Sequence, residues 1–116
     1  MQYLLIICHD ESFSPTETLT REIIAWNKVM ESRGILKYGN PLRPPSDAKT
    51  IRVRKGKLLL TDGPFSDTSE KIAAYVLIEC STVEEAINAA SQHPMEKVAT
   101  VEVRPIWEYL AILHDL

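Results

Sequence analysis

The sequence predicts an α+β fold of the ferredoxin-like kind, a βαββαβ sandwich in which two helices cover one face of an antiparallel sheet. Four apolar segments have the length of strands, and two segments with apolar residues at helical spacing alternate with them in that order. A shorter alternating segment between the second and third strands predicts an inserted β-hairpin. The chain has 116 residues, which suits a single domain covering residues 1–116.

Composition narrows the functional classes. The net charge of -3 argues against nucleic acid as a partner, and no apolar run is long enough to cross a membrane. The first residues do not resemble a secretory signal, so we expect a cytoplasmic protein. Cys8 and Cys80 have no metal-binding spacing, and we expect reduced buried thiols, with a disulfide between them as the alternative.

The first strand is predicted at Tyr3–Cys8, where apolar residues on both faces indicate a central position in the sheet. The next segment predicts a helix with Ser14 as its N-cap, Pro15 at its first position and Glu17 completing a capping box. Gly34 is well placed to end this helix. The apolar face of the helix consists of Leu19, Ile23, Trp26 and Met30.

A short second strand is predicted at Ile35–Tyr38, and residues 51–54 and 57–61 form the hairpin around Lys55-Gly56. The basic residues in and before this hairpin are Arg43, Lys49, Arg52, Arg54, Lys55 and Lys57, against the single acid Asp47. Two interpretations stay open, a solvated hairpin face or a flap that attracts anions.

The third main strand is predicted at Ala73–Cys80 and is again apolar on both faces. Thr82-Val83-Glu84-Glu85 begins the second helix as a capping box, and His93-Pro94 ends it. The last strand is predicted at Val98–Arg104, and residues 106–113 are expected to add a terminal helix.

Strands that are apolar on both faces do not fit a monomer of this fold. Both helices lie on one face of the sheet, yet Leu4–Ile7 and Tyr75–Ile78 are apolar on the other face as well. A second copy of the chain is the simplest cover for that face. We therefore expect a homodimer formed through the open sheet face.

The segment Asp62-Gly63-Pro64-Phe65 carries a resemblance to a known family. With the stretches around it, the sequence is similar to the YCII-related (YciI-like) family, in the branch named after its DGPF motif. The other matching segments are Gly34-Ile35-Leu36 with Leu42, Pro45-Ser46, Thr50–Lys57, Ser69-Glu70-Lys71, His93-Pro94 and Val101–Ile106. The resemblance covers nearly the whole chain and implies a dimeric α+β barrel of two ferredoxin-like units.

The resemblance implies little about activity. Related barrels include enzymes that act on small, often aromatic or oxygenated molecules. YciI-like members are discussed as enzymes that use a histidine in the first helix and an aspartate before a proline after the second. Here Ile24–Lys28 contains no histidine, and His93 rather than an aspartate precedes Pro94, so that pair is not carried over.

The predicted topology brings four polar residues to one edge of the sheet. His9 and Asp10 follow the first strand, Asp62 precedes the third main strand, and His93 follows the second helix. Such a cluster could perform acid–base chemistry or hold a metal, although no local motif supports a metal site. We predict His9, Asp62 and His93 as catalytic and Asp10 as ligand-binding, with a cap or surface position as the alternative for a histidine. No phosphate loop or dinucleotide fingerprint is present, so we expect no cofactor.

A second candidate set lies on the open sheet face, where Glu79 joins Tyr75 on one strand and Thr100, Glu102 and Arg104 alternate on another. We predict Tyr75, Glu102 and Arg104 as ligand-binding, with Arg104 as the anchor for a small anion. The alternative is an ion-pair network of Arg104 with Glu102 or Glu79.

Two interpretations of Asp62–Phe65 stay open. In the structural one, Gly63 and Pro64 set a turn and Phe65 packs it onto the sandwich. In the functional one, the turn presents Asp62 to a pocket.

The function predicted from these features is that of a homodimer that binds a small anionic or aromatic molecule, with no nucleic-acid or membrane partner. Acid–base catalysis of the hydrolase or lyase type is one outcome of such binding. A non-catalytic ligand-binding or regulatory module of the same fold is the alternative. A nucleic-acid module is the weakest class, because the strands lack the aromatic signature of RNA-binding sheets.

Overall fold

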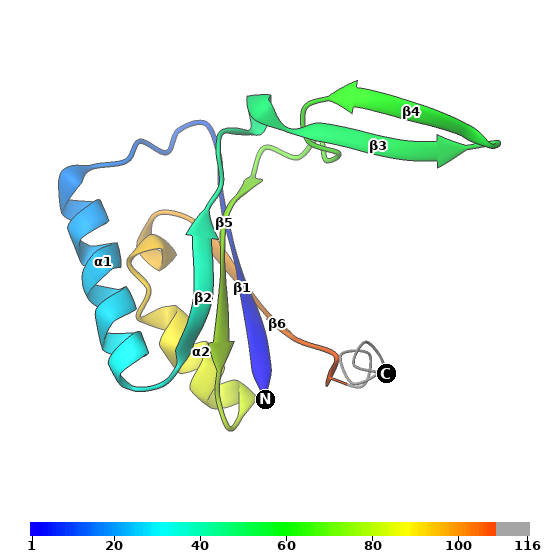
Figure 1. The fold of residues 1–116 in the computed structure, drawn as a ribbon. Coiled ribbons are helices and arrows are strands. Elements are labelled where there is room, and N and C mark those ends of the chain that lie inside the picture. Colours follow the sequence, from blue (N-terminus) through cyan, green and yellow to red (C-terminus); the bar gives the residue numbers. More distant parts are fainter. Residues whose placement is uncertain (109–116) are drawn as a thin grey trace.

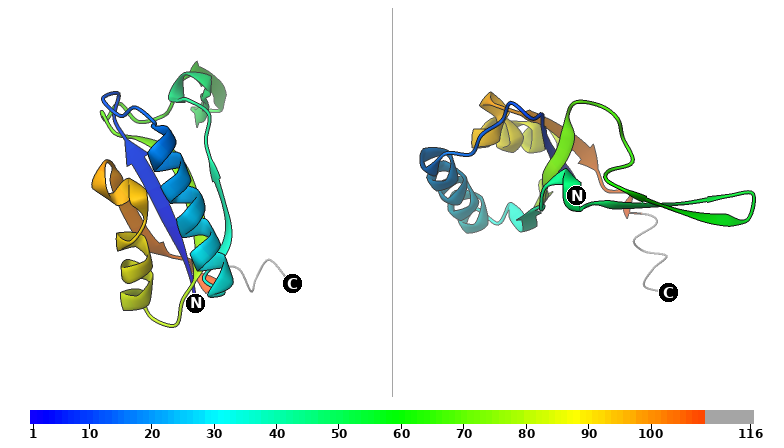
Figure 2. Two further views of the ribbon diagram at one scale, coloured as in Figure 1. Left: turned by 90° about the vertical axis from the view of Figure 1, so that its left-hand side faces the viewer. Right: turned by 90° about the horizontal axis from the view of Figure 1, so that it is seen from above.

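A computed structural model of the protein describes residues 1–108 and confirms the α+β class. Four strands form one antiparallel sheet in the order β2-β5-β1-β6, and two helices pack on one of its faces (Figures 1 and 2). The strands are β1 (Gln2–His9), β2 (Leu36–Pro41), β5 (Lys71–Glu79) and β6 (Thr100–Pro105), and the helices are α1 (Glu17–Ser32) and α2 (Val83–Ser91). The four strands and two helices follow one another in the predicted βαββαβ order.

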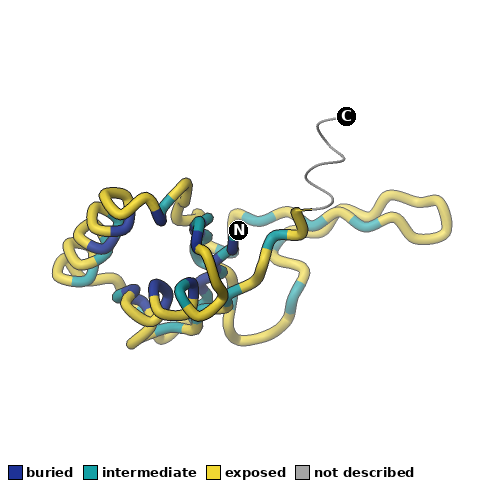
Figure 3. The backbone as a smooth tube through the Cα atoms, turned by 90° about the horizontal axis from the view of Figure 1, so that it is seen from below, coloured by how far each residue is buried: buried dark blue, intermediate teal, exposed yellow. Residues whose placement is uncertain are grey.

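The two middle strands, β1 and β5, supply the sheet side of the core. Tyr3, Leu5 and Ile7 alternate along β1 and are at most 2% exposed, and Val76 and Ile78 alternate in the same way along β5. The residues between them on both strands are only partly buried, because α1 and α2 both lie on the other face (Figure 2). Figure 3 shows the buried residues gathered between the helices and the sheet. We call the uncovered side of the sheet the open face.

Helix α1 begins later than predicted. Thr16 is its N-cap, and its hydroxyl accepts a hydrogen bond from the backbone N–H of Leu19 at 3.0 Å. Ser14 and Pro15 lie in the loop before the helix, so the prediction of Ser14 as the cap is wrong. The segment offers two hydroxyl groups, and Thr16 has the extended backbone (φ -121°, ψ 158°) that an N-cap requires. At the other end, Gly34 has a φ of 73° and ends the helix as predicted.

Helix α2 begins as predicted. The hydroxyl of Thr82 accepts from the backbone N–H of Glu85 at 3.2 Å, and the Glu85 carboxylate accepts from the backbone N–H of Ser81 at 3.1 Å. The two helices are joined by a buried hydrogen bond in which Trp26 Nε1 donates to the carbonyl oxygen of Ala89 at 3.1 Å. Since α2 presents alanines to the core, the large indole of Trp26 fits beside it.

Residues 49–62 form a separate two-stranded sheet, which we call the arm. Its strands β3 (Lys49–Arg54) and β4 (Lys57–Asp62) pair around Lys55 and Gly56, whose φ values are 52° and 74°. Two consecutive left-handed residues match the twist of hairpin strands, and Gly56 adopts this conformation without strain from a Cβ atom. The predicted hairpin is confirmed. It projects from the side of the sheet opposite the helices (Figures 1 and 2).

The rest of the described chain consists of loops and the short 3-10 helices η1 (Pro45–Asp47) and η2 (Pro94–Lys97). Cys8 and Cys80 are free thiols, and burial raises the pKa of both. The predicted terminal helix over 106–113 falls mostly outside the described residues, and Ile106 and Trp107 are not helical. Within residues 1–108, no helix has the length and apolar character needed to cross a membrane.

The cap of α1 predicts different effects for two neighbouring hydroxyl residues. Thr16→Ala should lower the free energy of unfolding by about 1 kcal/mol, because the N–H of Leu19 loses its partner. Ser14→Ala, the matched control in the same loop, should change it by less than about 0.5 kcal/mol. Urea unfolding followed by circular dichroism measures both values. Equal effects of the two substitutions would show that the cap assignment is wrong.

Candidate functional site

A cavity of about 590 Å³ lies between α1 and the β2–β5 side of the sheet, near the end of β1. Its apolar wall comes from several elements and includes Phe13, Leu19, Ile23, Leu36, Val76 and Met95. Its polar groups include two histidines, His9 and His93. A largely apolar cavity of this size with a few polar groups is typical of a small-molecule site.

His93 is held rigidly in the wall of this cavity and is only 3% exposed. Its Nδ1 accepts a hydrogen bond from the backbone N–H of Met95 at 3.1 Å, which caps η2, and its ring meets Trp26 edge-on at 4.6 Å between centroids. Burial lowers the pKa of His93 to about 4, so the ring is neutral at pH 7. Because Nδ1 accepts, the neutral ring carries its proton on Nε2. Within residues 1–108, the hydrogen bond of the His93 ring is made at Nδ1 and leaves Nε2 for a ligand.

His9 ends β1 and lines the same cavity. Its Nδ1 lies 3.1 Å from the carbonyl oxygen of Asp10, and since a carbonyl oxygen can only accept, Nδ1 donates. The ring stacks on Phe13 at 4.3 Å between centroids, with 24° between the ring planes. In its neutral form His9 therefore has a lone pair on Nε2.

The hydrogen bonds thus assign opposite tautomers to two histidines that line one cavity. The proton of neutral His93 is on Nε2, whereas neutral His9 has an acceptor at the same atom. A donor and an acceptor beside one ligand space are the two components of acid–base chemistry. The structure thus brings His9 and His93 to the same cavity, and their predicted catalytic role stays a prediction.

The cavity wall has cationic but no anionic side chains. Arg43 and Lys71 line it, and no Asp or Glu occurs among its described lining residues. Both cations also have protein partners: Arg43 pairs with Asp47 at 2.9 Å, and Lys71 Nζ donates to the carbonyl oxygen of Ser66. The charge distribution favours a ligand with an anionic or carbonyl head group over a cation.

Asp10 lies next to the cavity but does not line it. Its carboxylate accepts from the hydroxyl of Ser12 and from the backbone N–H of Ser12 at 2.9 Å, and these bonds lower the pKa of Asp10 below its usual value. Its carbonyl oxygen also accepts from the backbone N–H of Phe13 at 3.2 Å. Asp10 therefore shapes the turn that places Phe13 against His9, and its predicted role in ligand binding stays a prediction.

Asp62 is not brought together with the histidines. It ends β4 in the arm, where it pairs with Lys49, and it does not line the cavity. The prediction of a single cluster of four polar residues is wrong, because the inserted hairpin stands away from the sheet instead of continuing its edge. Across residues 1–108, no group of three or more His, Cys, Asp and Glu side chains could hold a metal ion.

The second predicted set, Tyr75, Glu102 and Arg104, belongs to strands of the open face. Arg104 pairs with Glu102 at 2.5 Å, and their side chains are 67% and 48% exposed. The Tyr75 hydroxyl accepts from Asn40 Nδ2 at 3.3 Å, while β5 also contributes Tyr75 to the cavity lining. The ion pair is the one that the sequence suggested as the alternative to a ligand anchor. A ligand-binding role for these three residues stays a prediction.

The turn at Asp62–Phe65 lies at the base of the arm. Gly63 has a φ of 95°, and its N–H donates to the carbonyl oxygen of Ala48 at 2.7 Å, so a glycine is required there. Phe65 is 68% exposed. The interpretation that Phe65 packs the turn onto the sandwich is wrong for the single chain, because the turn belongs to the arm and not to the helix–sheet layers.

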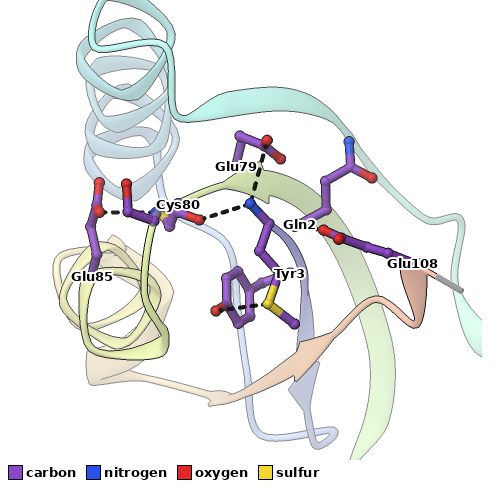
Figure 4. A network of polar contacts seen from close by, with 8 residues as sticks. Gln2, Tyr3, Glu79, Cys80, Glu85 and Glu108 are labelled. Carbon is purple, nitrogen blue, oxygen red and sulfur yellow. Dashed lines mark hydrogen bonds and ion pairs between the residues drawn. The ribbon is translucent and has the colours of Figure 1, made fainter.

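A separate polar network lies at the opposite end of β1 (Figure 4). The amino group of Met1 donates to the carbonyl oxygen of Cys80 at 3.1 Å and contacts Glu79 Oε1 at 3.5 Å. Glu79 therefore pairs with this amino group and not with Arg104, which corrects one of the suggested networks. The hydroxyl of Tyr3 donates to the sulfur of Met1 at 3.5 Å, and burial is the main cause that raises the pKa of Tyr3. These contacts tie the first residues to the end of β5.

Several residues that shape the cavity escaped prediction. Asn27 was detectable, because it is a polar residue within the apolar stripe of α1 that contributes Ile23 to the same wall. Gly39 interrupts β2, where a Cβ atom would lie 2.9 Å from the carbonyl oxygen of Tyr75. Phe13 and Lys71 become part of the site only through the tertiary structure, because their sequence neighbours give no indication of it.

Comparison with known proteins adds the family. The model of the YCII-related domain matches residues 1–110. The chain belongs to the YCII-related family. An uncharacterised protein of Rhizobium meliloti (strain 1021) is 28% identical to it over 117 residues, covering 94% of each chain. The resemblance noted from the sequence is thereby confirmed at the level of the family, and the cavity is the candidate site of this YCII-related domain.

Burial of His93 predicts a specific loss of stability of the YCII-related domain in mild acid. The folded pKa of about 4 lies below the ordinary value of 6.5, so the unfolded state binds a proton first as the pH falls. The stabilisation is complete above pH 6.5 and is lost as the pH falls towards 4. From pH 7 to pH 4.5, His93 should lower the free energy of unfolding by about 2 kcal/mol.

The matched variant for this test is His93→Asn, because Asn places an acceptor where Nδ1 lies and does not titrate. Urea unfolding at several pH values should show the difference in free energy between wild type and variant shrinking as the pH falls through this window. A difference that stays constant between pH 7 and pH 4.5 would contradict the assignment of a buried neutral His93.

Asp10 does not interfere with this test. Its pKa is lowered from the ordinary Asp value of 3.8, so its effect on stability falls at a lower pH than that of His93.

Proposed function

We propose that this YCII-related protein is a homodimer that binds a small, largely apolar or aromatic anion in the cavity between α1 and the sheet. His9 and His93 then act on the bound molecule as an acid–base pair. Membership of the DGPF branch and a cytoplasmic location stay predictions from the sequence. The observation that carries the proposal is the opposite tautomers of two histidines in the lining of one cavity.

The ligand class follows from the lining. Phe13, Leu19 and Ile23 offer an apolar surface for a flat or branched hydrocarbon body. Lys71 and the Nε2–H of His93 offer donors to a carboxylate or a carbonyl oxygen, and no lining carboxylate opposes a negative charge. The site therefore suits a small acid or carbonyl compound with an apolar substituent.

The chemistry that suits this pair is proton transfer next to a carbonyl group, as in reactions of the lyase type. Nε2 of His9 takes the proton from the carbon beside the carbonyl, and the C–H electron pair moves into the new carbon–carbon double bond. The charge that develops on the carbonyl oxygen is stabilised by the Nε2–H of His93. Return of the proton from His9 restores the starting compound, so the step needs no further reactant.

One observation favours the alternative, a non-catalytic ligand-binding or regulatory module. A histidine base in an enzyme is commonly oriented by a carboxylate, whereas Nδ1 of His9 donates to the backbone carbonyl of Asp10. Such a module would use the same cavity and the same donors, and would bind without proton transfer.

Two substitutions of His93 separate its structural role from its binding role. His93→Asn keeps the acceptor that caps η2 but loses the Nε2–H, whereas His93→Gln keeps a donor near Nε2 and loses the cap. We expect His93→Asn to weaken binding of phenylacetate at least tenfold while it keeps the cap of η2. His93→Gln should bind more strongly than His93→Asn while losing about 1 kcal/mol of unfolding free energy. Isothermal titration calorimetry measures the binding, with 2-phenylethanol as the uncharged control ligand.

Binding of phenylacetate that is unaffected by His93→Asn would show that His93 is only a cap. Proton transfer is tested separately by the rate at which deuterium from D₂O enters phenylacetone, followed by NMR. His9→Asn keeps the donor to the Asp10 carbonyl and removes the acceptor at Nε2. It should therefore abolish the protein-dependent exchange and leave phenylacetate binding unchanged. Binding without any protein-dependent exchange in the wild type would select the non-catalytic module.

The dimer part of the proposal rests on the open face. Leu4 pairs with Leu77 across β1 and β5, and Ile6 pairs with Tyr75, so this face carries a central apolar strip. These residues are partly exposed in the single chain, and Tyr38 beside them on β2 is 59% exposed. Seating a second copy on the strip would remove it from water, which is the main source of association energy.

A lysine at the centre of this strip should prevent association. We expect Leu77→Lys to be monomeric at concentrations where the wild type is a dimer, because the ammonium group would be buried without a partner. The matched control is Ile87→Lys, which places the same group on α2 at a position 53% exposed. Sedimentation equilibrium measures both. A Leu77→Lys variant that dimerises as well as Ile87→Lys would exclude this face as the interface.

A further inference from the structure

The arm carries an apolar face that is mostly exposed in the described structure, residues 1–108. Cross-strand pairing places Ile51 opposite Leu60 and Val53 opposite Leu58, which puts the four aliphatic side chains on one side of the arm. The side chains are 64% exposed for Ile51, 66% for Leu60, 60% for Val53 and 68% for Leu58. The other side carries Arg52 opposite Leu59 and Arg54 opposite Lys57, and is mainly basic.

An arm of this kind is not stable in isolation. Two strands bonded only to each other are marginal in water, and a third layer or strand is normally needed. In the described structure β3 and β4 form a sheet of their own, without a hydrogen-bonded neighbour in the main sheet. Four clustered aliphatic side chains that are mostly exposed indicate an interaction surface.

The position of the arm points to a second copy as the occupant. Within residues 1–108, both the arm and the open face expose apolar side chains. The arm projects on the side of the open face (Figures 1 and 2), so a second copy seated there would lie within its reach.

The charge distribution points to the same occupant. The arm has five basic residues and one acidic residue, a net charge of +4, so a chain of net charge -3 leaves -7 on the remainder. An arm of one copy and the body of another therefore attract each other. The arm has no aromatic residue in its strands, which disfavours single-stranded nucleic acid as the occupant.

We infer that the arm reaches across to a second copy of the chain and lays the face of Ile51, Val53, Leu58 and Leu60 on the body of that partner. The inference rests on the proposed dimer: the arm projects on the open-face side of the sheet (Figures 1 and 2), where the second copy would sit. By two-fold symmetry each copy gives one arm and receives one. The pair of arms then adds to the interface made by the two open faces.

The test is a double substitution on the arm of the full-length protein. Ile51→Thr with Leu60→Thr removes one cross-strand apolar pair and keeps residues that suit a strand. We expect it to raise the dissociation constant of the dimer at least tenfold in sedimentation experiments. Leu59→Thr is the matched control, because it lies on the same strand but on the basic face, and should change the constant less than threefold. Urea unfolding confirms that the helix–sheet core, which is remote from the arm, is intact in both variants.

Hydrogen exchange gives a second readout on the wild type. Backbone amides of the arm should be protected at high protein concentration and should lose protection on dilution, because the partner leaves. A dimer that the double substitution does not weaken would overturn the arm inference and leave the open-face dimer standing. A wild type that stays monomeric at all concentrations would overturn both. Arm protection that appears only with anionic lipid vesicles would overturn the inference in favour of a membrane surface.

Discussion

The structure depends on one constraint: its two central strands are apolar on both faces, and the two helices within residues 1–108 cover only one of them. On the helix side, alternate residues of β1 and β5 make the buried core with Trp26 and Met30. On the other side, Leu4 and Leu77 pair across the same strands and are only partly buried in the described structure. A two-layer sandwich of this size cannot satisfy both faces by itself. The proposed second copy follows from this imbalance.

The candidate site shows how a structural contact can prepare a group for chemistry. The backbone N–H of Met95 occupies Nδ1 of His93 because η2 needs a cap, and the burial that follows holds the ring neutral. A neutral imidazole with a defined proton is a better hydrogen-bond donor to a ligand than a ring that exchanges between tautomers. At the end of β1, the Asp10 carbonyl oxygen accepts from Nδ1 of His9, so neutral His9 has its acceptor at Nε2, where neutral His93 has its donor. The loops after β1 and α2 thereby provide the cavity with one hydrogen-bond acceptor, on His9, and one donor, on His93.

Within residues 1–108, the arm and the open face both expose apolar side chains to solvent. The arm is cationic on one face and aliphatic on the other, whereas the body of the chain is acidic. In the described structure of the single chain, the aliphatic face of the arm and the open face of the sheet both stay in contact with water. The exposed Phe65 at the base of the arm belongs to the same pattern, since its ring lies outside the core. The turn at Asp62–Phe65 lies where the chain leaves β4, at the base of the arm.

The sequence by itself determined the order of the elements, the central place of β1 and β5, the cap of α2 and the family, because these depend on local periodicity and on short motifs. It also indicated His9 and His93 at one end of the sheet, since antiparallel topology fixes where strands end. Only the tertiary structure decided between Ser14 and Thr16, because both can cap and the local pattern does not distinguish them. It also separated Asp62 from the histidines. The alternation of apolar and polar residues predicts a hairpin but does not predict the direction in which the hairpin leaves the sheet. The tautomers and the burial of His93 likewise arise from contacts between residues distant in sequence, which no local pattern contains.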